Sequence, residues 1–279
     1  MPLVNPNPPS AAHPAIKVGI GGWAFEPWRG TFYPEHLPQS KELAYASREL
    51  TAIEINGTYY GLQKPTTFAK WRDETPDGFV FSLKATRYAT NRRVLAEAGD
   101  SIERFVQSGI TELGPKLGPI VWQFAPTKIF DPEDFEAFVE LLPKHIDSHA
   151  LRHVLEVRHA SFMTDAFIKL VRRHKMATVF TDSSDYPSFA DLSTDFAYAR
   201  LMCSSEKLKT GYAPKALDAW TERARTWAAG STPDDLPRVS SKDKTARTRE
   251  VFVFFINGAK VRAPEAARSL IARLAKSPK

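Results

Sequence analysis

Apolar and polar positions divide most of the chain into two kinds of segment. From Lys17 onward, short runs rich in Val, Ile and Phe alternate with longer stretches in which apolar residues recur every three or four positions. The short runs are continuously apolar, which is typical of parallel strands buried on both faces. We therefore expect eight β-strands, at Lys17–Gly22, Ala52–Asn56, Phe79–Lys84, Pro119–Phe124, His153–Arg158, Ala177–Thr181, Phe196–Met202 and Glu250–Asn257.

The longer stretches carry signals that begin and end helices. Asp131 precedes Pro132 and two further acids, a combination that favours a helix N-terminus because the acids and the proline suit the first turn. A second helix is predicted from Thr164 to the cations at 172–174, which suit a helix C-terminus. The last helix is predicted to begin near Ala263.

Strand and helix alternate eight times, and this repeat predicts one α/β domain, a (β/α)₈ TIM barrel. Such a barrel typically needs about 250 residues, which fits a chain of 279 residues. An open dinucleotide-binding sheet is the weaker alternative, because no strand is followed by GxGxxG and the glycines at 19–22 lack the required spacing. We expect the barrel to occupy residues 16–276.

Two segments depart from the repeat. Residues 1–15 contain five prolines and neither Lys nor Arg, which predicts a flexible arm rather than a signal or transit peptide. Residues 230–249 are poor in apolar residues and rich in Ser, Thr, Lys and Arg, which predicts a mobile basic surface loop. A loop that leads into a strand lies on the amino face of a barrel, so we favour a solvated loop over an arm that binds nucleic acid.

Composition narrows the class of protein. The content of 43% hydrophobic and 25% charged residues is that of an ordinary globular protein. The single cysteine, Cys203, excludes an intrachain disulfide and favours a reducing, cytoplasmic location. No run approaches 18 apolar residues, so we predict no membrane span. A net charge of +6 is compatible with anionic small molecules or nucleic acid as partners.

Charged side chains fall where the predicted strands end, which is where barrel enzymes place their active sites. Glu54 and Glu156 lie between aliphatic residues, and a buried acid is costly unless it is paired. Lys84, Arg158 and Arg200 also lie inside predicted apolar strands and are the obvious partners. These charges could form a structural network that closes the barrel top. We favour the second interpretation, a site of acids, bases and anion-binding groups.

Chemical type suggests a role for each side chain. Glu54 and Glu156 are candidates for general acid and base, because burial and neighbouring charges can separate two carboxylate pKa values. Asp182 is a third candidate, with a helix cap as the alternative. Lys84 could hold phosphate or act as an amine base or nucleophile. Side chains expected to bind or orient a ligand are Trp23, Trp28, Asn56, Tyr59, Gln123, Arg158, Arg200 and Asn257.

No cofactor motif is evident. The seven histidines are scattered, and no HxxxH or CxxC pair lies on a predicted inward face, so we expect no zinc site. Glu54, Glu156 and Asp182 leave a carboxylate site for Mg²⁺ or Mn²⁺ as an alternative that no motif supports. Aromatic residues on the first two strand–helix loops suggest either a stacking wall for a ligand or packing over the barrel mouth, and we favour packing.

Seven segments in order resemble the signatures of the YecE-like family, domain of unknown function 72. They are GIGGWAFEPWRGTFYP, AIEINGTYYGLQKPTTFAKW, GFVFSLKATRYAT, LGPIVWQFAP, HVLEVRHASF, TDSSDYP and FVFFINGAKVRAPEAARSL. The resemblance covers residues 17–275 and implies a TIM barrel. Its general plan is similar to barrels of the endonuclease-four and xylose-isomerase types, an analogy of fold that implies a nucleic-acid or sugar-phosphate ligand.

The chain departs from the family pattern at two positions. The family usually has Thr-His where this chain has Thr90-Asn91, and His-Gly where it has Met202-Cys203. If those histidines serve as acid, base or metal ligand in the family, this chain either binds without catalysing or catalyses with its carboxylates alone.

Two functions of different classes follow. The leading hypothesis is a hydrolase or lyase-like enzyme acting on a phosphate-bearing small molecule or a nucleic-acid fragment. The second is a non-catalytic protein that binds a phosphorylated ligand or single-stranded nucleic acid.

Overall fold

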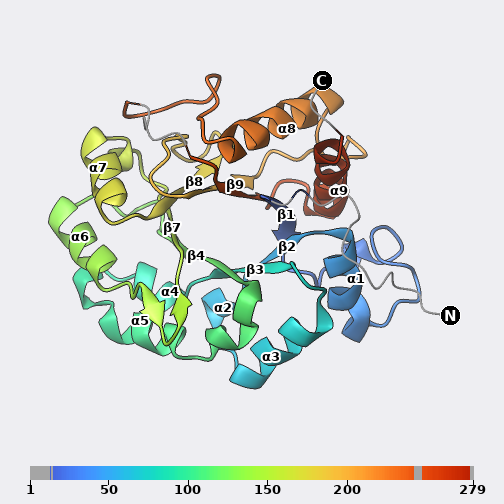
Figure 1. Ribbon diagram of the computed structural model, residues 1–279, viewed down its shortest axis with the longest axis horizontal. Coiled ribbons are helices and arrows are strands. Elements are labelled where there is room, and N and C mark those ends of the chain that lie inside the picture. Colours follow the sequence, from blue (N-terminus) through green and yellow to red (C-terminus); the bar gives the residue numbers. More distant parts are fainter. Residues whose placement is uncertain (1–12, 14, 242–246, 277–279) are drawn as a thin grey trace.

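Eight parallel strands close into a barrel in the computed structural model, which describes residues 13, 15–241 and 247–276. Their order around the barrel is β1-β10-β9-β8-β7-β4-β3-β2, and β1 pairs with β2 to close the ring (Figure 1). The barrel strands are β1 (Ile16–Gly21), β2 (Ala52–Ile55), β3 (Val80–Lys84), β4 (Leu117–Gln123), β7 (His153–Glu156), β8 (Ala177–Thr181), β9 (Phe196–Leu201) and β10 (Glu250–Phe255). The short pair β5 (His145–Ile146) and β6 (His149–Ala150) is antiparallel.

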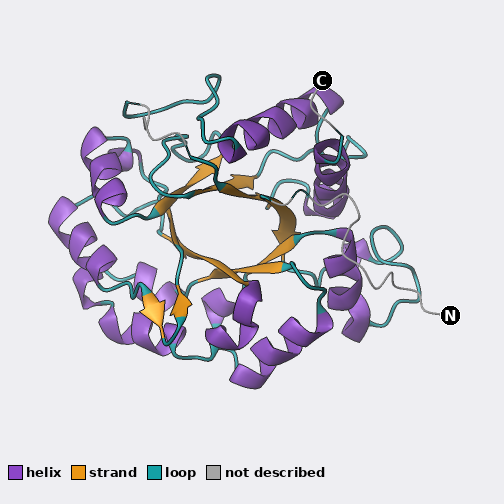
Figure 2. Ribbon diagram, in the orientation of Figure 1, coloured by secondary structure: helices purple, strands orange, loops and turns teal. Residues whose placement is uncertain are grey.

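Helices surround the barrel, as Figure 2 shows, and cover the outward faces of the strands. They are α1 (Glu42–Glu49), α2 (Gly57–Tyr60), α3 (Pro65–Glu74), α4 (Arg87–Thr90), α5 (Gly99–Val106), α6 (Pro132–Glu140), α7 (Asp165–Arg173), α8 (Pro214–Ala228) and α9 (Ala263–Leu274). Short 3₁₀ segments lie at Glu26–Trp28, Gln39–Lys41, Leu95–Glu97, Ile110–Lys116, Ala160–Phe162 and Lys260–Arg262.

The fold predicted from the hydrophobic pattern is confirmed. Each of the eight predicted runs coincides with a barrel strand, and their ends agree to within two residues. The predicted helix starts are also present. Asp131 caps α6 by accepting hydrogen bonds from the backbone nitrogens of Glu133 and Asp134 at 3.0 and 3.2 Å. Thr164 caps α7 through the backbone nitrogen of Phe167 at 3.2 Å.

Apolar side chains form two buried clusters, one outside the barrel strands and one inside the barrel. The larger cluster packs between the strands and the surrounding helices. A smaller buried cluster fills the interior and takes members from every barrel strand except β1, where Gly19 stands instead. A Cβ atom on Gly19 would lie 2.0 Å from the carbonyl oxygen of Ala52, so this close approach of β1 and β2 requires glycine. The interior cluster comprises Ala52, Val80, Val121, Val154, Ala177, Val179, Phe196, Tyr198, Phe252, Phe254 and Ile256.

The segments outside the repeat are partly described. The predicted arm, residues 1–15, lies almost wholly outside the described residues. In the loop between α8 and β10, residues 230–241 are anchored: Leu236 is buried, and the Asp191 carboxylate accepts hydrogen bonds from the backbone nitrogens of Val239 and Ser240 at 2.8 and 2.9 Å. Residues 242–246 are not described, so the mobility of this loop stays a prediction. No helix within the described ranges has the length and apolar character needed to cross a membrane.

Candidate ligand-binding site

The strand period places a polar layer directly above the apolar barrel interior. Side chains two positions apart on a strand point to the same face. Ala52, Val154 and Tyr198 belong to the interior cluster, so the residues two positions further on also point inward. Those residues are Glu54, Glu156 and Arg200. The sequence thus brings charged side chains from different strands together at the carboxyl end of the barrel.

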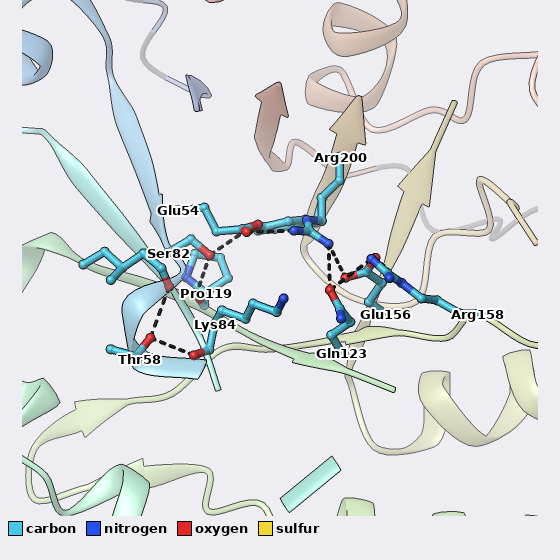
Figure 3. Close-up of polar contacts among 11 residues, drawn as sticks. Glu54, Thr58, Ser82, Lys84, Pro119, Gln123, Glu156, Arg158 and Arg200 are labelled. Atoms are coloured by element: carbon cyan, nitrogen blue, oxygen red, sulfur yellow. Dashed lines mark hydrogen bonds and ion pairs between the residues drawn. The ribbon is translucent and has the colours of Figure 1, made fainter. Parts of the chain in front are cut away.

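Arg200 lies at the centre of this layer and is 2% exposed. Its Nη2 lies 3.0 Å from Oε1 of Glu54, and its Nη1 donates to Oε2 of Glu156 and, at 3.3 Å, to Oε1 of Gln123 (Figure 3). Burial opposes the charge on Arg200, but the two carboxylates raise the pKa of its guanidinium above the usual range. Arg200 therefore joins β9 to β2, β7 and β4.

Arg158 holds the other oxygen of Glu156. Its Nε and Nη2 donate to Oε1 of Glu156 at 3.0 and 2.7 Å, and Nη2 also donates to Gln123 at 3.0 Å. The guanidinium carbon lies 4.3 Å from the centroid of the Tyr186 ring. Burial alone would raise the pKa of Glu156, yet the guanidiniums of Arg200 and Arg158 hold it below its ordinary value. Glu156 is accordingly ionised.

Glu54 is equally well satisfied. Its second oxygen, Oε2, accepts a hydrogen bond from the Tyr198 hydroxyl at 2.8 Å, and that hydroxyl lies 2.8 Å from Oγ of Ser82. Burial and the nearby Glu54 charge raise the pKa of Tyr198, so its hydroxyl keeps its proton. All four carboxylate oxygens of Glu54 and Glu156 therefore have partners. The two arginines line the cavity and the two glutamates do not, so the glutamates hold the arginines in place from the side away from the cavity.

A cavity of about 640 Å³ opens at this end of the barrel. Basic side chains contribute much of its polar wall, and none of the described residues that line it is acidic. Its lining comprises Gly21, Gly22, Trp23, Ala24, Trp28, Ile55, Asn56, Gly57, Tyr60, Gln63, Trp71, Lys84, Gln123, Arg158, Arg200, Phe255, Ile256, Asn257, Lys260 and Ala263. The chemistry of this wall suits an anionic ligand.

Lys84 is the one basic residue of the polar layer that forms no ion pair with a described carboxylate. It is 8% exposed, and its Nζ lies 4.0 Å from the centroid of the Tyr59 ring. Within the described part of the chain, Nζ has no hydrogen-bond acceptor, and in Figure 3 its side chain extends toward the Arg200 cluster without a dashed contact at the nitrogen. Burial, and then the charge of Arg200, lower its pKa to about 8.

The predicted aromatic residues have different roles. Trp28 is fully buried, and its indole nitrogen donates to the backbone oxygen of Lys260 at 3.0 Å. Trp23 is half-buried and packs edge-to-face on Trp71 with ring centroids 5.2 Å apart. Nζ of Lys260 lies 4.6 Å from the centroid of the Phe25 ring. The rings of the first loop thus pack beside the cavity and also form part of its wall.

The two predicted asparagines both line the cavity. Asn56 follows β2 directly, and Asn257 lies two residues beyond β10. Asn257 has φ +61°, in the left-handed region that asparagine tolerates better than most residues do.

Asp182 does not line the cavity. Its Oδ1 accepts hydrogen bonds from the backbone nitrogens of Met202 and Cys203 at 2.6 and 3.2 Å, and Oδ2 accepts one from the Tyr212 hydroxyl at 2.8 Å. It therefore fixes the chain where β9 ends. The structure does not bring it together with Glu54 and Glu156 as metal ligands. The His, Cys, Asp and Glu residues that do converge, among those described, are Glu136, Glu140 and His174 on the outside of the barrel.

Several residues of the site were not predicted from the sequence. Tyr198 and Ser82 stand two positions before Arg200 and Lys84, so the strand period was a usable signal for both. Tyr186, Trp71 and Lys260 lie inside the quoted family segments but outside the predicted strands, so the strand pattern did not single them out. Asn91 and Met202, which stand at the customary histidine positions, do not line this cavity.

A closed (β/α)₈ barrel with a cationic cavity at the carboxyl ends of its strands makes this chain a TIM-barrel protein. Residues 17–279 match the family described as a protein of unknown function, DUF72. The chain belongs to that family, as its sequence signatures indicated.

The chain is also similar to two proteins that carry names. The chain is 27% identical over 150 residues to the UPF0759 protein YecE of Escherichia coli K12, a match that covers 53% of this chain and 50% of the relative. It is 28% identical over 116 residues to the UPF0759 protein YunF of Bacillus subtilis, covering 40% of each. The chain thus spans about half the length, or less, of these relatives. The crystal structure of a DUF72 family protein from Thermotoga maritima superimposes with a TM-score of 0.68 at 22% identity, covering 92% of this chain and 97% of that one. That likeness concerns the fold.

Proposed function

We propose that the chain is an enzyme, a hydrolase or lyase, that binds a phosphate-bearing ligand in the barrel-top cavity and transfers a proton through Lys84. One observation carries the proposal: Lys84 is a largely buried lysine at the cavity wall whose Nζ has no hydrogen-bond acceptor among the described residues. An unpaired buried charge is costly, and an anionic ligand would supply the missing partner.

The charges around Lys84 support an anionic ligand. Three cations, Lys84, Arg158 and Arg200, stand against two carboxylates, Glu54 and Glu156, and the surplus positive charge faces the cavity. The carboxylates hold both guanidiniums in fixed orientations, so little side-chain entropy is lost when a ligand binds. Phosphate oxygens suit this arrangement because guanidinium and ammonium groups bind them through short, charge-assisted hydrogen bonds.

Lys84 is also the group best suited to move a proton. A pKa of about 8 allows a lysine to give or accept a proton near neutral pH, which an ordinary lysine does poorly. Glu54 and Glu156 are less suited to this role, because each of their oxygens is engaged with Arg158, Arg200 or Tyr198. We therefore assign proton transfer to Lys84 and a positioning role to the two glutamates.

A non-catalytic protein that binds a phosphorylated ligand is the second candidate. The full engagement of both carboxylates favours it, as do Asn91 and Met202 at positions where the family usually has histidine. The two candidates differ in the fate of the ligand. An enzyme converts the bound compound on long incubation, whereas a binding protein returns it unchanged.

The free thiol of Cys203 supports the further proposal of a reducing, cytoplasmic location.

The test is a thermal-shift screen of the purified protein against inorganic phosphate, sugar phosphates and nucleotides. A ligand at about 100 times its Kd should stabilise the fold by about 2.7 kcal/mol. Lys84→Met should abolish the shift, and Lys215→Met, at an exposed lysine of α8, should keep it. A shift that survives in Lys84→Met, or no shift with any phosphate compound, would contradict the proposal.

A further inference from the structure

A second cavity, of about 750 Å³, lies beside α4 and α5. It is formed by the loop after α2, by α4 with the residues that flank it, and by α5. Its lining residues are Leu62, Thr86, Arg87, Tyr88, Asn91, Arg92, Ser101 and Arg104. The proposed function does not involve this cavity.

Its positive charge is not compensated within the described residues. Three of its lining residues, Arg87, Arg92 and Arg104, are arginines, and none of the lining residues is acidic. None of the three guanidiniums forms an ion pair with a carboxylate of the described chain. Arg92 donates to Oγ of Ser101 at 3.2 Å, while its Nε is buried without a hydrogen-bond partner there. Such a cluster of unpaired arginines is what an anion-binding site requires.

Aromatic rings connect this cavity to the first one. The Arg87 guanidinium lies 5.7 Å from the centroid of the Tyr60 ring and 5.4 Å from that of the Tyr88 ring. Tyr60 lines the first cavity, and Tyr88 lines the second. Both are unusually exposed for tyrosines, at 63% and 60%. Arg87 thus lies near an exposed ring of each cavity.

We propose that this surface binds single-stranded nucleic acid, with one phosphate in the Lys84 cavity, a later phosphate at the arginines of the second cavity, and a base stacked on Tyr60 or Tyr88. This inference rests on the proposed phosphate ligand of the first cavity. A strand alternates phosphates with flat rings, and the surface alternates cations with flat rings. A small phosphate ester would occupy only one of the two cavities. A duplex keeps its bases stacked inside and leaves the tyrosines without a partner.

Fluorescence anisotropy with a labelled thymidine oligonucleotide of about eight nucleotides tests the proposal. We expect the double variant Arg87→Ala/Arg104→Ala to weaken binding at least about tenfold and to flatten the salt dependence, because each phosphate contact contributes a slope of about −0.7 for a single strand. Tyr88→Ala should weaken binding without changing the slope of the salt dependence. Tyr88→Trp should restore the affinity, because a base can stack on the indole ring. These side chains are exposed, so the variants should melt like the parent protein.

Arg238→Ala is the matched control, since it removes an exposed arginine from the loop between α8 and β10. Binding that falls equally in this control and in the double variant would mean attraction by net charge alone and would overturn the proposal. Equal affinity for a duplex or for a polyglutamate peptide of the same length would overturn it too. If the double variant binds normally while Lys84→Met still loses its phosphate-induced thermal shift, the second site is refuted and the proposed function stands. If the parent protein responds to neither phosphate compounds nor the oligonucleotide, both are refuted.

Discussion

Arg200 on β9 and Glu54 on β2 meet at 3.0 Å inside the barrel, although β1 and β10 separate their strands in the ring. The same guanidinium reaches Glu156 on β7. One side chain thus spans the carboxyl end of the barrel and neutralises acids from two other strands. Both the stability of the fold and the charge of the cavity depend on it.

Replacement of Arg200 should destabilise the protein strongly. In Arg200→Ala, Glu54 and part of Glu156 lose their charge partner in a buried environment, which costs about 3–5 kcal/mol. Urea unfolding measures this loss. The exposed pair of Arg268 with Glu49, at 3.1 Å, is the control, since Arg268→Ala should cost less than about 1 kcal/mol. Similar losses in both variants would mean that the central network contributes no more than a surface ion pair.

Lys84 should make the free energy of unfolding depend on pH. Its pKa is about 8 in the folded protein and 10.5 ordinarily, so between these values the unfolded chain binds more protons and stability rises with pH. The rise amounts to about 3 kcal/mol at roughly 1.4 kcal/mol per pKa unit. Lys84→Met removes it. We expect the variant to be more stable than the parent protein at neutral pH, and this advantage should shrink as the pH rises from about 8 to 10.5.

Denaturant titrations of both proteins across that range provide the measurement, and their difference cancels the other groups that titrate there. A constant difference would show that Lys84 titrates normally in the folded protein. Phosphate binding should weaken over the same range as the ammonium loses its proton, and Lys84→Arg should bind at high pH because arginine stays charged.

Asp182 should prove structural. Asp182→Ala removes the acceptor for Met202, Cys203 and Tyr212 and should cost about 2 kcal/mol, since the part-buried donors of Met202 and Tyr212 lose their partner. Tyr212→Phe, which removes one of those three contacts, should cost about 1 kcal/mol. The phosphate-induced thermal shift should persist in both variants. Loss of that shift without loss of stability would instead place Asp182 in the ligand site.

Gly19 should not tolerate a side chain. Gly19→Ala places a Cβ atom 2.0 Å from the Ala52 carbonyl oxygen, so β1 and β2 must move apart, at a cost of about 3 kcal/mol or more. Gly61→Ala meets no atom within 4 Å and should change stability by less than about 0.5 kcal/mol. The melting temperatures of the two variants make the comparison. Equal melting temperatures would show that the strands can separate without cost.

The barrel could be predicted from sequence because each strand is buried on both faces and therefore stands out as a continuous apolar run. The positions of Glu54, Glu156 and Arg200 could also be predicted, since they lie within those runs, near the carboxyl ends. Their pairing could not. Which oxygen each guanidinium takes depends on how the strands are staggered around the closed ring, and that stagger leaves no local pattern.

The second cavity could not be predicted from the sequence either. Arg87, Arg92 and Arg104 lie on or beside two short helices, where a sequence shows only ordinary surface charges. Only the packing of α4 beside α5 brings them around one space, and only the structure shows that no described acid accompanies them.

The bridging position of Arg200 also constrains how this chain can diverge. Exchange of Arg200 alone leaves Glu54 without a charge partner inside the barrel, and exchange of Glu156 alone leaves Arg158 without one, so no single step leads to a neutral barrel top. The three positions should therefore be inherited as one unit, retained together or replaced together. Gln123 is an uncharged neighbour of both arginines, so its substitution leaves no charge without a partner and should be tolerated better.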